Sequence, residues 1–203
     1  MSRYTEPRLK KMRSLGTQLP GLSRKSIERR PYPPGAQGQS RKKISEYGLR
    51  LKEVQKLRFN YGVSERQLRR IVLEARRRPG NTASIIAQLL ERRLDNAVFR
   101  AGFAPTIPAG RQLVNHGHIL VNGRKVDIAS FRVKVGHQLA IHARSKDNEH
   151  ILSSLAQPSL KRPSWLQYDA NRQTAEVVSL PDEESISFPV LMSLVIEFYA
   201  ARV

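Results

Sequence analysis

The feature that most constrains the fold is a change of hydrophobic period within residues 105–143. Thr106 followed by Pro108 is typical of a helix start, because proline lacks only an N–H that the first turn leaves unbonded anyway. Gly117 suits the left-handed residue that ends many helices. A short helix is therefore predicted between Thr106 and Gly117, with polar residues along one edge.

After Gly117 the apolar residues alternate as they do in strands. Ile119 and Val121 predict one strand, and Asn122-Gly123 is the strongest short signal for a hairpin. The residues that predict the return strand and the strands beyond it, around a turn at Gly136, are Val126, Ile128, Val133, Val135, Leu139 and Ile141. Residues 91–143 should therefore form two helices followed by a small antiparallel sheet.

The flanking segments read mostly as helices. Ser45 is a good N-cap for a helix that ends at Gly62, and Ser64 with Gln67 has the spacing of a capping box. A further helical pattern begins near Thr82, in which Asp95 is either interior or the cap of a fresh helix. A polar link follows Ala143, weak strand patterns surround residues 165–180, and a final helix is predicted from Pro189.

A long basic loop lies nearer the N-terminus, at residues 19–39. Its many prolines and glycines cannot continue a helix. Such a loop is expected to have no core of its own and to become ordered against a partner.

The charge of the chain is strongly uneven. There are 36 Lys and Arg against 17 Asp and Glu, which gives a net charge of +19. Residues 1–90 carry +16 and residues 91–145 carry +6, whereas residues 146–203 carry −3. This excess favours a polyphosphate partner, RNA or DNA, with an anionic membrane surface as the rival interpretation. A nucleic-acid footprint followed by a segment for packing or protein contact explains the asymmetry.

Two classes of function are weakened by what the sequence lacks. There is no cysteine, which excludes disulfides, thiolate metal sites and cysteine nucleophiles. No apolar run approaches the length of a membrane-spanning helix, and the N-terminus lacks the apolar stretch of a secretory signal. The chain is therefore expected inside a cell or an organelle.

The predicted short helix and hairpin place a row of hydrogen-bond donors on a rigid element. Arg111, Gln112, Asn115 and His116 fall near one edge of the helix, His118 follows the Gly117 bend, and Arg124 follows the hairpin turn. Structured RNA is recognised mainly through its shape, phosphates and 2′-hydroxyls. The row is spaced to meet such groups.

The same residues carry a family resemblance. The segments 90–95, 98–100 and 110–124 resemble the RNA-binding module named after small-subunit ribosomal protein four, segments 31–35, 41–48 and 55–62 resemble that family's N-terminal domain, and 195–199 resembles its final helix. The resemblance implies an α+β fold in which an N-terminal helical domain is completed by the C-terminal helix around the inserted module. The implied division is a basic extension at 1–44, a helical domain at 45–90, the module at 91–188 with its core at 91–145, and the returning helix at 189–203.

The resemblance also implies a function. Members bind small-subunit (16S-type) ribosomal RNA, nucleate assembly of the subunit body, and touch small-subunit protein five and other proteins near the messenger entry path, an interface linked to decoding accuracy. The expected location is the ribosome of a bacterial cytoplasm or plastid stroma. No enzyme activity, cofactor, metal, membrane contact or homo-oligomer is expected. The candidate RNA-binding residues are Arg3, Arg8, Lys10, Lys11, Arg13, Arg24, Lys25, Arg41, Lys42, Lys43, Arg50, Lys56, Arg58, Tyr61, Arg92, Arg93, Arg111, Gln112, Asn115, His116, His118, Asn122 and Arg124.

The sequence departs from the family pattern in two ways. Some bacterial relatives carry an N-terminal cysteine metal site, which this chain cannot form. Relatives often have alanine where this chain has Gly110, and a glycine there is expected to cost the short helix roughly 1 kcal/mol.

Several alternatives remain at particular residues. His116 and His118 fall short of the usual tetrahedral metal site, so hydrogen bonding to RNA or plain solvent exposure is favoured. Arg93-Leu94-Asp95 matches a catalytic string of pseudouridine synthases, but a helix cap or an ion pair at Asp95 is favoured. Tyr61 either stacks on a base or packs half-buried. For the whole chain, the rivals are an RNA-modifying enzyme or RNA chaperone and a DNA-binding regulator.

Overall fold

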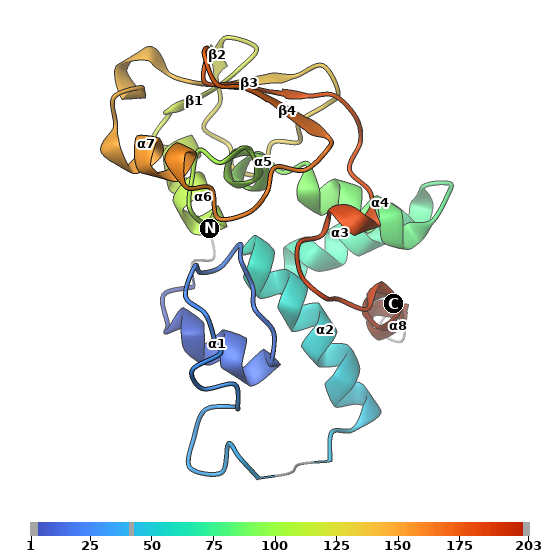
Figure 1. Ribbon diagram of the computed structural model, residues 1–203. Coiled ribbons are helices and arrows are strands. Elements are labelled where there is room, and N and C mark those ends of the chain that lie inside the picture. The colour runs from blue at the N-terminus through green and yellow to red at the C-terminus, as the bar shows by residue number, and fades with distance from the viewer. Residues whose placement is uncertain (1–3, 41–42, 201–203) are drawn as a thin grey trace. The chain divides into compact units, whose positions relative to one another are not determined.

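The computed structural model describes residues 4–40 and 43–200 (Figure 1). The chain separates into two compact units. One combines the residues up to Ile86 with those from Ser187 onward, and the other is Ala87–Ile186. The first is helical, and the second contains helices and a sheet, so the predicted α+β class is confirmed.

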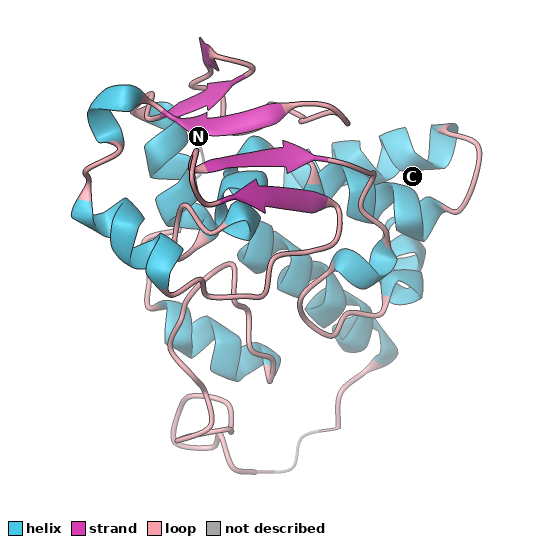
Figure 2. Ribbon diagram, turned by 45° about the horizontal axis from the view of Figure 1, so that its top comes forward, coloured by secondary structure: helices cyan, strands magenta, loops and turns pink. Residues whose placement is uncertain are grey.

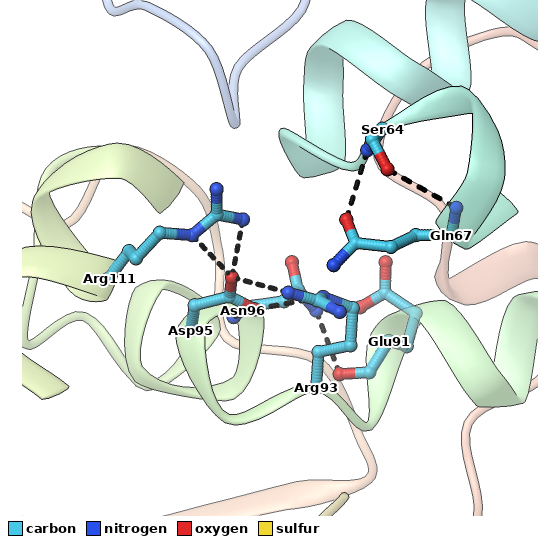
Figure 3. Close-up of polar contacts among 7 residues, drawn as sticks. All are labelled: Ser64, Gln67, Glu91, Arg93, Asp95, Asn96 and Arg111. Carbon is cyan, nitrogen blue, oxygen red and sulfur yellow. Dashed lines mark hydrogen bonds and ion pairs between the residues drawn. The ribbon is translucent and has the colours of Figure 1, made fainter. Parts of the chain in front are cut away.

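The helical unit contains α1 (Arg8–Leu15), α2 (Glu46–Tyr61), α3 (Glu65–Arg77), the first turn of α4 (Thr82–Glu91) and α8 (Met192–Ala200). The predicted starts are confirmed. Ser45 Oγ accepts the Gly48 N–H, and Ser64 and Gln67 make both bonds of the capping box (Figure 3). Gly62 ends α2 with φ 58°.

The C-terminal helix packs on α2 and α3, as expected. The Leu191 N–H donates to Glu53 Oε2 at 2.9 Å, and the Tyr199 hydroxyl donates to Glu65 Oε1 at 2.7 Å. Val195 and Phe198 are buried in the core. The helix begins at Met192 rather than at Pro189, and the Leu191 N–H directly before it is bonded by the Glu53 side chain.

The expectation that the basic loop lacks a core is wrong for its first residues. Leu19 and Leu22 are 0% and 3% exposed, and the Gly21 N–H donates to Asn60 Oδ1 of α2 at 2.9 Å. The two leucines join the buried Met12 and Leu15 of α1, so burial of apolar surface offsets the entropy of ordering this segment.

The second unit continues α4 into α5 (Leu94–Ala101) and α6 (Ile107–Asn115), followed by the sheet. Five antiparallel strands lie in the order β2-β1-β3-β5-β4 (Figure 2). Their bounds are β1 Ile119–Val121, β2 Arg124–Lys125, β3 Gln138–Ile141, β4 Leu166–Asp169 and β5 Thr174–Val177. Helix α7 (Glu149–Ala156) occupies the predicted polar link, and 3₁₀ turns span Ala143–Ser145 and Glu183–Ser185.

The core of this unit consists of buried apolar side chains from its helices and strands. Phe103, Ile119, Leu139 and Trp165 belong to it and are all buried. The alternation seen in β1 and β3 is therefore the alternation of a sheet with one face on the core.

The predicted return strand is wrong beyond Lys125. The Val126 N–H still donates to Ile119 O at 3.4 Å, but Ile128 is 59% exposed and the chain has left the ladder there. The cause is the start of α5, whose first N–H groups have no partner within the helix. The Leu94 N–H donates to Phe131 O at 2.8 Å and the Asp95 N–H to Ala129 O at 3.2 Å. The segment after β2 thus caps a helix instead of extending the sheet.

Candidate nucleic-acid interface

Asp95 is the centre of a buried charge cluster at the start of α5 (Figure 3). Its side chain is 0% exposed and lies between two arginines. Arg93 donates to Oδ1 and Oδ2 at 3.1 and 2.9 Å, and Arg111 of α6 donates twice to Oδ2, at 3.0 and 2.7 Å. The Asn96 N–H donates to Oδ1 at 3.0 Å. A fresh helix, α5, therefore begins after α4 ends, and the Asp95 side chain forms ion pairs with Arg93 and Arg111.

This cluster changes the roles predicted for its arginines. Arg93 is buried and donates from Nε and one terminal nitrogen to Asp95, so in this structure it has a structural partner, and its contact with RNA stays a prediction. Arg92 donates its Nε–H to Val133 O at 2.7 Å. The Arg111 side chain keeps 19% of its surface exposed, so it has both a structural partner and an outer edge.

Gly110 allows α5 and α6 to approach closely. A Cβ atom on Gly110 would lie 2.7 Å from the Asp95 carbonyl oxygen and 3.5 Å from Val98 Cγ1. The expectation that this glycine only weakens the short helix is therefore incomplete. Its low helix propensity is offset by a helix contact that no larger residue permits without a backbone shift.

The turn from α6 into β1 presents the predicted donors. Gln112, Asn115 and His116 are exposed on α6 and its C-cap, and Arg124 is exposed on β2. Gly117 has φ +72°, and the Lys125 side chain crosses it so closely that a Cβ there would lie 2.0 Å from Lys125 Cε. The left-handed turn thus positions both the donor row and a lysine that the sequence prediction missed.

His118 is held at the end of this turn. Its Nδ1 lies 2.7 Å from Ser145 Oγ, and its carbonyl accepts the His142 N–H at 2.8 Å. The His116 and His118 ring centroids are 6.0 Å apart. Burial lowers the pKa of His118 first, and the positive fields of His116, Arg144, His142 and Lys125 lower it further.

Asn122 has a structural role in the hairpin. Its φ is 49°, in the left-handed region that this turn requires. Its Oδ1 accepts the Gln138 N–H at 2.8 Å, which fixes β1 against β3. The sequence placed Asn122 among the RNA-binding residues, but its side-chain oxygen is used within the fold.

Several candidates on α2 are paired within the helical unit. Arg50 bonds to Glu197 at 3.0 Å, Lys56 to Glu53 at 2.7 Å, and Arg58 to Glu65 at 3.3 Å. Tyr61 is 1% exposed and packs near Phe188, so its ring cannot stack on a base; packing is the correct alternative.

The remaining candidates belong to the N-terminal 43 residues, most of them to α1 and the basic loop. Arg13 donates to Arg30 O and Tyr32 O at 3.0 and 3.1 Å, and Arg8 donates to Leu22 O at 3.4 Å. Lys11 Nζ lies 5.4 Å from the Phe59 ring centroid. Arg8, Lys10, Arg24 and Lys25 are exposed, as is Lys43 just before α2, whereas Arg3, Arg41 and Lys42 lie outside the described residues.

Residues 4–40 and 43–200 contain neither a metal-ion cluster nor a membrane-spanning helix. No group of three or more His, Asp or Glu side chains there is arranged to hold a metal ion. No helix in those ranges has the length and apolarity to cross a membrane.

Comparisons with known proteins agree with this geometry. Residues 3–91 match the model of the ribosomal protein S4/S9 N-terminal domain, and residues 92–139 match the S4 domain. Full-length relatives named small ribosomal subunit protein uS4 are 53% identical in Methylobacillus flagellatus and 52% identical in Nostoc punctiforme, and the relative named uS4B in Nitrosomonas europaea is 50% identical. Each alignment covers 100% of both chains. The chain belongs to the family of small ribosomal subunit protein uS4, structural ribosomal proteins with an RNA-binding S4 domain, and it is not an enzyme.

Proposed function

We propose that this protein is a primary binder of small-subunit (16S-type) ribosomal RNA and nucleates assembly of the subunit body. The observation that carries this proposal is the exposed donor row Gln112, Asn115, His116 and Arg124, together with the outer edge of Arg111. The row stands on a helix and hairpin fixed by the Asp95 cluster and by Gly117. Such preorganised donors lose little conformational entropy when they meet phosphates.

The exposed cations of α1 and the basic loop, together with residues 41–43, supply a second part of the proposed interface. Lys10, Arg24, Lys25 and Lys43 are exposed, and Arg41 and Lys42 are assigned from sequence alone. Long-range attraction and counterion release from these residues add affinity without sequence preference.

Protein partners follow the family expectation. We propose contact with small-subunit protein five and with other small-subunit proteins near the messenger entry path, and through that contact a role in decoding accuracy. The proposed location is a ribosome in a bacterial cytoplasm or plastid stroma. The division at residues 44, 90 and 188 stays part of this proposal.

A titration with folded small-subunit ribosomal RNA tests the central claim. Filter binding should show selective affinity over unrelated duplex DNA of equal length, and a logarithmic plot of affinity against salt should fall steeply. Equal affinity for the DNA would contradict the proposal. Co-sedimentation with the small subunit is an independent check.

Asn115→Ala tests the donor row itself. Asn115 is exposed at the end of α6, so its removal should leave the fold intact and weaken RNA binding by about 0.5–1.5 kcal/mol. Asn171→Ala, in the exposed turn between β4 and β5, is the matched control and should bind normally. Arg111→Ala should cost binding about 1–3 kcal/mol but also disturbs Asp95, so its stability must be measured beside its affinity.

A further inference from the structure

A compact group of basic side chains gathers where β1 and β3 pair. Ile119 faces Ile141 across the ladder, which brings His118 beside His142 and the Ala143–Ser145 turn. Lys125 arrives from β2, across Gly117. His142, Arg144 and Ser145 lie beyond the residues that match the S4 domain, so the grouping depends on strand pairing that the domain match does not include.

The charged groups that shift the pKa of His118 are all basic. His116 stands at the end of α6, Lys125 on β2, and His142 and Arg144 after β3. Protonating His118 beside Lys125 and Arg144 is unfavourable in the free protein, because like charges repel at short range. A bound phosphate reverses that sign, since one anion next to several cations lowers the energy of all of them.

The hydrogen bond to Ser145 prepares His118 for this change. Ser145 is buried, and its hydroxyl rotates to donate to or accept from Nδ1. When the ring gains a proton, Nδ1–H donates to Ser145 Oγ, and Nε2–H remains as a donor for an external oxygen. Protonation therefore needs no change of ring position.

We propose that His116, His118, Lys125, His142 and Arg144 form one binding site for an RNA backbone phosphate, and that RNA binding loads a proton onto His118. The inference rests on the proposed function and adds a regulation to it. Because the free protein binds the proton weakly and the complex binds it tightly, RNA affinity must rise as pH falls.

The experiment compares RNA affinity across pH at constant ionic strength. Full-length protein and folded small-subunit ribosomal RNA are titrated between pH 8.0 and pH 5.5. The native protein should bind about 3- to 10-fold more tightly at the lower pH, since one pKa unit corresponds to a tenfold change. His118→Asn keeps a polar group for Ser145 and should show a smaller pH dependence than the native protein. His150→Asn, an exposed histidine on α7, should behave like the native protein.

A second measurement uses the unmodified protein. Nuclear magnetic resonance of the His118 ring should show a higher pKa with RNA bound than without it. An unchanged pKa, or an equal pH dependence in His118→Asn and native protein, overturns this inference alone if selective RNA binding persists at pH 8.0. Absence of selective binding at pH 8.0 overturns the proposed function, and this inference with it.

Discussion

The cations of α2 and those around His118 have opposite surroundings. On α2, a side-chain nitrogen of Arg50, Lys56 and Arg58 lies within 3.3 Å of a carboxylate oxygen in each case. Burial lowers the pKa of His118, and every charged neighbour that lowers it further is a basic residue. The sequence shows both groups as the same basic residue types, but the structure assigns the first to holding helices together and the second to a positive field. Positive charge in this chain therefore has two uses, which substitutions should separate.

The largest expected effect is a loss of stability when the buried ion pairs of Asp95 are broken. Asp95→Asn leaves Arg93 and Arg111 facing an uncharged side chain in a buried site, and removing one partner of such a pair costs about 3–5 kcal/mol. Chemical denaturation should show this loss. Asp127→Asn, at an exposed position, should change stability little. A stability loss no larger than that of the control would show that the cluster contributes nothing to the fold.

Gly110→Ala tests the helix contact that supports the donor row. The added Cβ would lie 2.7 Å from a backbone oxygen, so α6 must shift away from α5. The overpacking should cost about 1–3 kcal/mol, partly offset by the better helix propensity of alanine. Ala109→Gly, next to it on α6, introduces no close contact and should cost about 1 kcal/mol through helix propensity, together with the loss of a partly buried methyl group. A more stable Gly110→Ala variant would contradict the packing argument.

A matched pair of lysines sharpens the comparison directly. Lys56→Met removes a partner of the buried Glu53 and should lower the unfolding free energy by about 1–3 kcal/mol while leaving RNA binding by the folded protein unchanged. Lys125→Met should do the reverse, keeping stability and reducing the slope of log affinity against log salt by about 1. Similar effects of both substitutions on the salt slope would break the distinction.

The smallest effect concerns pH and the protein without RNA. Burial is the first cause that lowers the pKa of both His118 and His137, so each favours its neutral form in the folded state. Their stabilisation is complete above their unfolded pKa of about 6.5 and is lost as pH falls through the lower folded pKa. The thermal midpoint should therefore drop by about 1–3 °C on acidification, opposite in sign to the change in RNA affinity. His118→Asn should reduce the drop, and a rising midpoint would contradict the pKa direction.

Local signals predicted most of the elements. Ser64 with Gln67, Gly117 and Asn122-Gly123 act through bonds to residues a few positions away, so their patterns are complete in the sequence. The short β2 was not predictable in this way. Residues 129–131 bond to the start of α5, a pairing that spans more than thirty residues and competes with the ladder.

In the candidate site, too, the features set by local sequence were predictable and those set by tertiary contacts were not. The exposed row from Gln112 to Arg124 followed from helix and hairpin periodicity. The pairing of Arg111 with Asp95 and the arrival of Arg144 beside His118 depend on tertiary contacts. Net charge, finally, carries no information on which cations already have carboxylate partners, which is why Arg93 and the cations of α2 were predicted to bind RNA and Lys125 was not.

The attachment of α8 to α2 has a consequence for biosynthesis. Glu53 is translated long before Leu191, the residue whose N–H it accepts, and all of Ala87–Ile186 is made in between. While the chain is still growing, the helical unit lacks α8, whereas all strands of the inserted unit have already been made. The inserted unit is therefore free to fold first during translation, and the helical unit closes only once the last helix has left the exit tunnel.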